Sequence, residues 1–264
     1  MQKYLVIGNP IDHSLSPKIH NYWFKKNNID ATYEKKQVNE NDIKNIVFEV
    51  KNGKIDGLNV TVPFKKKIIH FLDRLTPHAK ESNSVNTIFK KDNLVFGDNT
   101  DIDGFKYALN HINYSFKNKK VFILGSGGVV PSIILALKKL NVSSISLSNR
   151  TRQRAEELKR IHKNIEIIDW GQNVNFDIII NATSIGLKKN EKINLDLSKA
   201  GINKLFYDVI YNPNKTNFLL KGEKLGNQIE NGKMMFIYQA QLAFNIWHNI
   251  LPKIDDETIK LLET

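Results

Sequence analysis

Short apolar runs alternate with amphipathic helical patterns from one end of the chain to the other. In the first part, strands are expected at residues 4–8, 31–37, 57–62, 85–89 and 94–96. The last two runs flank the turn residues 91–93, so they are expected to pair as a hairpin. Helices are expected from Ser16-Pro17 with Ser16 as N-cap, over 42–51, and from Asp101 or Asp103 to about His111.

A second series of the same kind begins at Lys120. Strands are expected at 121–124, 144–147, 177–180 and 205–209, and helices from the glycine-rich turn at 125–128 through 139, then over 151–162 and 234–251. Such alternation is typical of α/β proteins with parallel sheets. The sequence therefore predicts two α/β domains, residues 1–103 together with 233–264, and residues 104–232.

Composition places the chain among ordinary globular proteins. Hydrophobic residues make up 41% of the 264 residues and charged residues 25%. There is no cysteine, which excludes disulfides and thiolate metal sites, and the histidines show no metal-ligand spacing. No apolar stretch has the length of a signal peptide or a membrane span. We therefore expect a soluble cytoplasmic protein without a metal.

The formal net charge of +12 raises the question of a nucleic-acid partner. Most of this charge is lysine in short runs, and the basic residues are not interleaved with aromatic ones. The pattern favours a small acidic, phosphate-bearing ligand, and neither a nucleic acid nor a membrane is expected as a partner.

The turn at 125–128 has the form of a dinucleotide-binding loop between a buried strand and a helix. Glycines in such a loop let the backbone approach the pyrophosphate, which lies at the helix N-terminus. Gly125 and Gly127 match the first two fingerprint positions, whereas Val130 stands where the third glycine or alanine is expected. The alternative is a glycine turn that serves close packing alone.

The end of the next strand favours NADP over NAD. An NAD site usually has an acidic residue there for the ribose hydroxyls, but no carboxylate occurs between Gly125 and Glu156. Instead Arg150, Arg152 and Arg154 cluster, and guanidinium groups suit the 2′-phosphate of NADP. The alternative is a solvated charge run at a helix start.

In the first domain, the segment 59–65 (N-V-T-V-P-F-K) carries candidate chemistry. Asn59 and Thr61 are two residues apart on one face of a strand, and Lys65 follows its carboxyl end, where open α/β sheets bind ligands. The residues expected to point into the core are Leu58, Val60 and Val62. Taken alone, this segment favours Lys65 as a plain surface lysine.

Two helix starts carry further candidates. Asp101 closes a polar loop before a helix, and a simple N-cap role would account for it. Ser14 and Ser16 stand at another helix start, where hydroxyls and free backbone N–H groups suit a carboxylate.

Taken in order, these segments resemble the shikimate dehydrogenase family over nearly the whole chain. The matching pieces are Gly8-Asn9-Pro10, 13–17 (H-S-L-S-P), 59–65, Val85-Asn86-Thr87, Asn99-Thr100-Asp101, 125–128, Asn149-Arg150-Thr151 with Arg154, 181–184 (N-A-T-S), Tyr207-Asp208, Tyr211-Asn212-Pro213, Gly232, Met235 and Gln239-Ala240. Any one piece is weak, but their collinear order is specific. Ser126 and Val129-Val130 depart mildly from the family pattern.

The resemblance implies a set of site residues. The implied catalytic pair is Lys65 and Asp101. The implied substrate residues are Ser14 and Ser16 for the carboxylate, Asn59, Thr61, Asn86 and Gln239 for the hydroxyls, and Tyr211 nearby. The implied cofactor residues are Gly125, Ser126, Gly127, Gly128, Val129, Asn149, Arg150, Thr151, Arg154, Val209 and Gly232.

The resemblance also implies an activity, the reversible NADPH-dependent reduction of 3-dehydroshikimate to shikimate in aromatic amino acid biosynthesis. Residues 1–103 and 233–264 would form the substrate-binding domain and 104–232 the Rossmann NADP-binding domain. A lysine ammonium can protonate the alkoxide that forms, and a neighbouring Asp101 would keep Lys65 charged. The reverse oxidation needs neutral Lys65, so its chemical step is expected to speed up as pH rises.

Alternatives remain at this point. One is a quinate/shikimate dehydrogenase of the same family, which would accept quinate and use NAD. Another is the methylenetetrahydrofolate dehydrogenase group, which has a similar architecture but lacks the pairing of 59–65 with 99–101. A non-catalytic NADP-sensing protein is a third, of another class. The assembly is expected to be a monomer or a homodimer.

Overall fold

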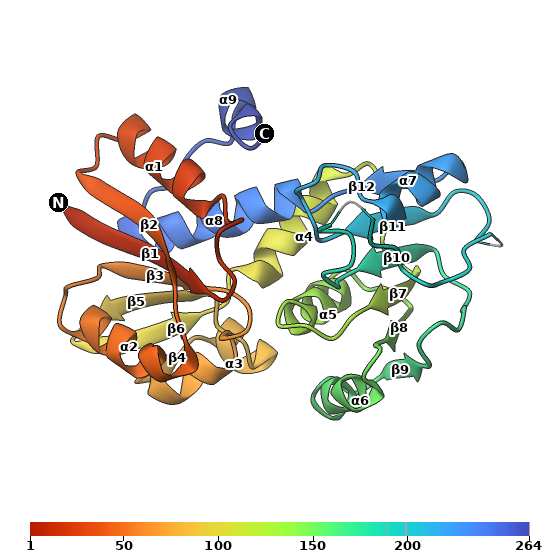
Figure 1. The fold of residues 1–264 in the computed structure, drawn as a ribbon, viewed down its shortest axis with the longest axis horizontal. Coiled ribbons are helices and arrows are strands. Elements are labelled where there is room, and N and C mark those ends of the chain that lie inside the picture. Colours follow the sequence, from red (N-terminus) through yellow and green to blue (C-terminus); the bar gives the residue numbers. More distant parts are fainter. Residues whose placement is uncertain (189, 199, 264) are drawn as a thin grey trace. The chain divides into compact units, whose positions relative to one another are not determined.

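The computed structural model describes residues 1–188, 190–198 and 200–263. The chain forms two compact units, Met1–Phe105 with Ile237–Thr264, and Lys106–Phe236 (Figure 1). It passes from one unit to the other within helix α4 (Asp101–His111) and returns within helix α8 (Lys233–His248).

A six-stranded mixed sheet forms the centre of the first unit, in the order β2-β1-β3-β5-β6-β4. Its strands are β1 (Gln2–Gly8), β2 (Ala31–Gln37), β3 (Gly57–Val60), β4 (Arg74–Leu75), β5 (Thr87–Lys91) and β6 (Leu94–Asp98). β1 pairs in parallel with β2 and β3, and β5 and β6 form the expected hairpin. Asp92 and Asn93 in its turn have φ of 50° and 60°, as a two-residue type I′ turn requires.

The two faces of this sheet have separate cores because successive side chains of a strand point to opposite sides. On β1, Tyr4 packs against aromatic rings of α1 (Ser16–Lys26) and α8, among them Phe24 and Trp247. Leu5 and Ile7 instead join an aliphatic cluster with α2 (Ile43–Lys51) and α3 (Pro77–Ser82), which lie on the other side of the sheet (Figure 1).

The second unit contains a fully parallel six-stranded sheet in the order β12-β11-β10-β7-β8-β9. Its strands are β7 (Lys120–Leu124), β8 (Ser144–Ser148), β9 (Ile165–Ile168), β10 (Ile178–Asn181), β11 (Leu205–Asp208) and β12 (Gln228–Glu230). Its helices include α5 (Val130–Lys139), α6 (Arg152–Ile161) and α7 (Asn217–Lys224) (Figure 1). The strand order reverses between β7 and β10, which is where doubly wound folds bind ligands. The expected class, two α/β domains of which one is Rossmann-like, is confirmed.

Several short elements have no counterpart in the sequence pattern. They are β4, α3, β9, α7, β12, α9 (Asp256–Lys260) and the 3₁₀ turns Glu40–Asp42 and Lys67–Phe71. Most of them span five residues or fewer, so they offer too few positions for an apolar period to stand out.

Four local expectations were wrong. The N-cap of α1 is Leu15, and Ser16 is already helical, because the Ser14 hydroxyl accepts the Ser16 N–H and fixes the turn one residue earlier. β3 ends at Val60, and Val62 is 56% exposed instead of buried, since Pro63 has no N–H with which to continue the ladder. Likewise α8 ends at His248 because Asn249 has a φ of 53°.

We predict that Phe244→Ala lowers the free energy of unfolding by about 3–5 kcal/mol. The Phe244 ring is fully buried on α8 and packs against the rings of Trp23, Phe24 and His248. Urea unfolding of the variant and wild type measures the effect. The matched control is Phe48→Ala on α2, where the ring is 61% exposed and the expected loss is about 0.5 kcal/mol or less. Equal losses in the two variants would contradict the assignment of the buried face of α8.

Candidate functional site

A lysine and an aspartate form a buried ion pair in the first unit. Lys65 follows β3, and Asp101 is the first residue of α4, separated from the end of β6 by two residues. Nζ of Lys65 lies 2.5 Å from Oδ2 of Asp101, and their side chains are only 11% and 6% exposed. The neighbours Lys66 and Lys67 are exposed, so Lys65 differs from the plain surface lysine that the segment alone favours. A buried charge pair of this kind is costly to break.

Amide side chains fix the aspartate of this pair. Asn86 Nδ2 donates to Asp101 Oδ1 at 2.9 Å, and Asn86 Oδ1 accepts the backbone N–H of Thr100 at 2.8 Å. The N–H of Asp101 donates to Asn99 Oδ1 at 3.0 Å. The start of α4 is therefore held by asparagine side chains, and the Asp101 carboxylate faces Lys65 instead of serving as a plain N-cap.

The other polar candidates of the first unit extend this network. Asn59 Nδ2 donates to the Asn86 carbonyl at 2.9 Å and to Thr87 Oγ1 at 3.0 Å. At the start of α1, the Ser14 hydroxyl donates to Ser16 Oγ at 3.2 Å. Asn59 and Asn86 thus lie in one hydrogen-bonded group with the ion pair. Thr87 is a member of that group for which the sequence analysis assigned no role.

Two further substrate candidates, Thr61 and Gln239, each lie in close contact with a glycine. Thr61 is half-buried, and a Cβ on Gly8 would lie 2.6 Å from Thr61 Cγ2. Gln239 lies on α8 against Gly104 of α4, where a Cβ would come within 2.8 Å of the Gln239 Cβ and 2.9 Å of its backbone nitrogen. Both glycines therefore allow main-chain approaches that a side chain would prevent.

In the second unit, the glycine-rich turn joins β7 to α5. Gly125 has a φ of 107°, and a Cβ there would lie 2.7 Å from the Ala182 carbonyl oxygen, so this position requires glycine. Gly127 is exposed, and a Cβ added there would make only an ordinary contact, 3.9 Å from the Ala182 carbonyl oxygen. Ser126, Gly128 and Val129 complete the turn, of which only Gly125 is buried. Val130, the departure from the fingerprint, is a fully buried core residue of α5.

The basic cluster after β8 divides into partnered and unpartnered arginines. Arg152 forms ion pairs with Asp169 and, at 3.2 Å, with Glu156. Arg150 and Arg154 are exposed, and neither has an ion-pair partner in the part of the chain that the structure describes. Nearby, Asn149 Nδ2 donates to the carbonyl of Thr151, the residue that precedes α6, at 2.8 Å. Two cations are thus left available for an anion at a helix start.

The remaining candidates follow β11 and β12. A Cβ on Gly232 would lie 2.1 Å from the carbonyl oxygen of Val209, so the two backbones are in direct contact. The ring of Tyr211 packs against Phe236, with centroids 4.7 Å apart. Tyr211 lies in the second unit, whereas the other six substrate candidates lie in the first.

A buried carboxylate organises the loops at the carboxyl ends of β10 and β11. Asp208 accepts hydrogen bonds from Asn181 Nδ2 at 3.1 Å, from the Ile210 N–H at 3.0 Å and from Thr216 Oγ1 at 2.6 Å. Asn181 Oδ1 in turn accepts from the Thr183 hydroxyl at 2.7 Å. Burial without a cationic donor raises the pKa of Asp208 to about 6. Asn181 and Asp208 stand in motifs of the sequence, but the pattern indicates no role for them.

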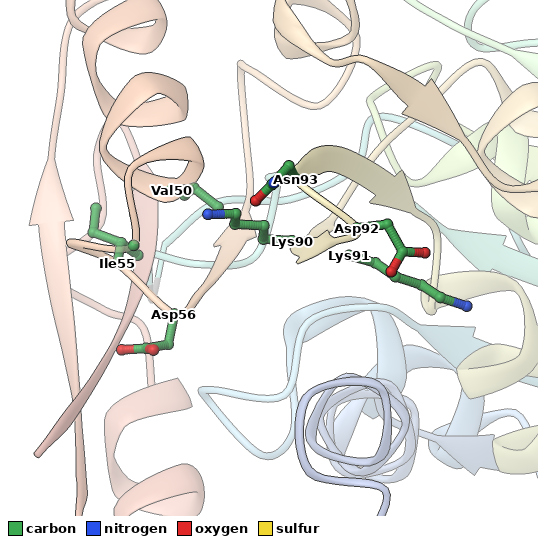
Figure 2. A pocket seen from close by; sticks show the side chains of 8 residues that line it. Val50, Ile55, Asp56, Lys90, Lys91, Asp92 and Asn93 are labelled. Atoms are coloured by element: carbon green, nitrogen blue, oxygen red, sulfur yellow. The ribbon is translucent and has the colours of Figure 1, made fainter.

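A surface pocket on the first unit lies away from all these candidates. It is lined by Val50, Gly53, Ile55, Asp56, Lys90, Lys91, Asp92 and Asn93 (Figure 2). The last turn of α2, the loop after it and the β5–β6 hairpin supply these residues, and the two lysines and two aspartates balance in charge. The pocket therefore carries no indication of a charged ligand.

Two kinds of feature are absent from the described residues, 1–188, 190–198 and 200–263. Within them, no group of three or more His, Cys, Asp or Glu side chains has the arrangement of a metal site. None of the helices that these residues form combines the length and the apolar character that crossing a bilayer requires.

A parallel sheet with a glycine-rich turn, and a second α/β unit with a buried Lys–Asp pair, are typical of dinucleotide-dependent dehydrogenases. Two family models match the chain, "Shikimate dehydrogenase substrate binding domain" over residues 6–88 and "Shikimate / quinate 5-dehydrogenase" over residues 106–208. The chain is 58% identical to a shikimate dehydrogenase (NADP(+)) of Pelagibacter ubique (strain HTCC1062), and the match covers 98% of each chain.

Solved structures agree with this result. The crystal structure of shikimate dehydrogenase from Aquifex aeolicus matches with a TM-score of 0.90 and 32% identity, over 100% of this chain and 96% of that one. Shikimate 5-dehydrogenase from Thermus thermophilus, in complex with NADP(H) and shikimate, matches with a TM-score of 0.90 and 27% identity, over 100% and 99%. The chain belongs to the shikimate dehydrogenase family. The resemblance seen in its motifs is confirmed.

We predict that Asp208 makes stability fall as pH rises from about 4 to about 7. Its pKa of about 6 in the folded chain exceeds the unfolded value of about 3.9, so the folded state binds the proton more tightly. This contribution is fully present below about pH 4 and is lost as pH rises through about 6. Denaturant unfolding should show wild type losing about 2–3 kcal/mol relative to Asp208→Asn over that range. A difference between the two that is independent of pH would contradict the raised pKa.

Proposed function

We propose that the chain catalyses the reversible, NADPH-dependent reduction of 3-dehydroshikimate to shikimate, with Lys65 and Asp101 as its acid–base pair. The observation that carries this proposal is the buried contact of 2.5 Å between Lys65 Nζ and Asp101 Oδ2, in a network of amide side chains. The family assignment makes the enzyme an NADP-dependent oxidoreductase that acts on a CH–OH group. Its reaction belongs to the biosynthesis of aromatic amino acids by way of chorismate.

The chemistry follows from the residue types of the pair. NADPH, when bound, supplies a hydride to the ketone carbon of the substrate. The carbonyl oxygen then gains negative charge, and the Lys65 ammonium stabilises that charge and donates a proton to complete the alcohol. Asp101 orients Lys65 through its Oδ2, while Asn86 holds the other carboxylate oxygen. In the reverse direction, neutral Lys65 takes the proton of the hydroxyl.

The substrate is a small carboxylic acid with hydroxyl groups, and the first unit offers matching partners. Ser14 and Ser16 stand at the start of α1, where hydroxyls and backbone N–H groups suit the carboxylate. The residues assigned to its hydroxyls are Asn59, Thr61, Asn86 and Gln239, and Tyr211 is the remaining substrate candidate. In this proposal residues 1–103 and 233–264 form the substrate domain.

The second unit, residues 104–232 in this proposal, binds NADP. The turn of Gly125, Ser126, Gly127, Gly128 and Val129 accommodates the pyrophosphate at the start of α5, and the exposed backbone at Gly127 fits a backbone–phosphate contact. Arg150 and Arg154, with Asn149 and Thr151, receive the 2′-phosphate. Val209 and Gly232 lie against the nicotinamide, where their mutual backbone contact leaves no room for a side chain.

Compartment and assembly complete the proposal. The enzyme acts in the cytoplasm as a monomer or homodimer on small molecules, with no nucleic-acid partner. Gel filtration coupled to light scattering measures the assembly directly.

We predict that Lys65→Ala lowers kcat by about 100-fold or more and leaves the KM for shikimate nearly unchanged. The absorbance of reduced nicotinamide, followed with shikimate and NADP, measures both constants. Lys66→Ala is the matched control, because that neighbouring lysine is exposed. Full activity of Lys65→Ala would remove Lys65 from the mechanism. Turnover by wild type with quinate and NAD, in preference to shikimate and NADP, would instead favour the quinate branch of the family.

We predict that Arg150→Ala and Arg154→Ala each lower kcat/KM for NADP by about 10- to 100-fold, the effect of one charge-assisted hydrogen bond. The kcat/KM for NAD, which has no 2′-phosphate, should change little. Arg152→Ala is the control, since Arg152 is already paired with Asp169 and Glu156. Equal decreases in kcat/KM for NADP and for NAD would argue against a 2′-phosphate site at these arginines.

A further inference from the structure

Tyr33 on β2 lies between two of the proposed substrate-binding groups. Its side chain is almost fully buried, and its hydroxyl donates a hydrogen bond of 2.6 Å to Asn59 Oδ1. The Ser16 side chain lies close enough to the same phenol to lower its pKa slightly, against the larger effect of burial. Burial raises the pKa of Tyr33 well above its ordinary value, so the hydroxyl keeps its proton and remains a donor.

Tyr33 therefore lies between two parts of the proposed substrate site, the serines at the start of α1 and the group of Asn59, Asn86 and Asp101. On the serine side, Ser16 Oγ accepts from the Ser14 hydroxyl at 3.2 Å. On the other side, Asn59 Nδ2 donates to the Asn86 carbonyl at 2.9 Å, and Asn86 Nδ2 donates to Asp101. Hydrogen bonds therefore run from Tyr33 through Asn59 and Asn86 to Asp101 of the proposed acid–base pair, and Ser16 with Ser14 lies beside Tyr33 at the other end.

The hydrogen bond from Tyr33 also determines whether the Asn59 amide can act as a donor or as an acceptor toward a ligand. Both amide hydrogens of Asn59 are committed, one to the Asn86 carbonyl and one to Thr87 Oγ1. Its Oδ1 accepts from Tyr33 and retains one lone pair. Asn59 can then act only as an acceptor toward a substrate hydroxyl, and the Tyr33 proton holds the amide in that orientation.

Tyr33 itself is held from its main chain and from its ring. Asn21 on α1 bonds both backbone groups of Tyr33, because its Nδ2 donates to the carbonyl and its Oδ1 accepts the N–H, each at 2.9 Å. The ring stacks on His20 of α1, with centroids 4.3 Å apart and planes 3° apart. Burial lowers the pKa of His20 to about 3, so the stacked imidazole is neutral. The helix that carries Ser16 is thereby fixed to Tyr33 at three points.

We propose that Tyr33 is a positioning residue, which sets the orientation of Asn59 and the place of Ser16 so that the substrate's carboxylate and hydroxyls are bound together. This inference rests on the proposed function, because Asn59 and Ser16 are the groups that Tyr33 positions.

The test is Tyr33→Phe, which removes the hydroxyl and keeps the stacked ring. We expect the KM for shikimate to rise about 5- to 50-fold, the effect of an unsatisfied buried acceptor, with kcat changed less than about threefold. The KM for NADP should stay at its wild-type value, while the urea midpoint falls modestly, because the Asn59 acceptor is also unsatisfied in the free enzyme. Tyr4→Phe is the matched control, because Tyr4 is an equally buried tyrosine of the same sheet whose hydroxyl has a weak contact of 3.4 Å with Gln2.

A double-mutant comparison separates positioning from a general effect. In the Ser16→Ala background, adding Tyr33→Phe should raise the KM for shikimate less than it does in wild type, because the two groups act together. An unchanged KM for shikimate in Tyr33→Phe would overturn the inference, as would a fall in kcat and a rise in the KM for NADP that are as large as the rise in the KM for shikimate. Absence of shikimate turnover in wild type would instead overturn the proposed function itself.

Discussion

The buried ion pair between Lys65 and Asp101 is the interaction on which the first unit's polar architecture depends. Two charges taken out of water are tolerated only when they are close and when their other hydrogen-bonding capacity is used. Both conditions hold, since the pair is separated by 2.5 Å and Asn86 donates to the second carboxylate oxygen. Asn86 also accepts the Thr100 N–H, so the amide that supports the charge also fixes where α4 begins. The support of the ion pair and the start of α4 therefore both depend on the Asn86 side chain.

The second unit handles a buried carboxylate differently. Asp208 is bonded by neutral donors, from Asn181, Thr216 and the Ile210 N–H, and no cation among the described residues compensates its charge. Its pKa is accordingly raised to about 6. Its hydrogen bonds tie the loop after β10 to the loop after β11, and both loops follow carboxyl ends of parallel strands. Val209 follows Asp208 directly, so this carboxylate helps to place the backbone that contacts Gly232.

The sequence was informative where a residue's role is local or periodic. The alternating apolar runs predicted both sheets, and the collinear motifs predicted the family and NADP, which the comparisons confirm. The burial of Val62 and the N-cap role of Ser16 were wrong, because each depends on how one neighbour, Pro63 or Ser14, is bonded. Tyr33 was missed for a related reason. In the sequence of β2, Tyr33 has the pattern of an ordinary core aromatic residue. Its proposed positioning role depends on a hydrogen bond to Asn59, which is 26 residues away in the chain. The roles assigned to individual site residues stay predictions.

The charge balance of the proposed substrate site follows from these contacts. An ion pair of Lys65 and Asp101 is neutral overall, so it exerts little net attraction on a carboxylate at a distance. The attraction must come from elsewhere, and α1 can supply it. Its first turn carries Ser16 and no acidic residue, its last turn carries Lys25 and Lys26, and a helix N-terminus favours an anion. In the proposed function, the Lys65–Asp101 pair then moves the proton, while a separate helix start binds the anion. In the proposed role, Tyr33 donates to Asn59 Oδ1 and lies beside Ser16, so it fixes the start of α1 relative to the polar group around the ion pair.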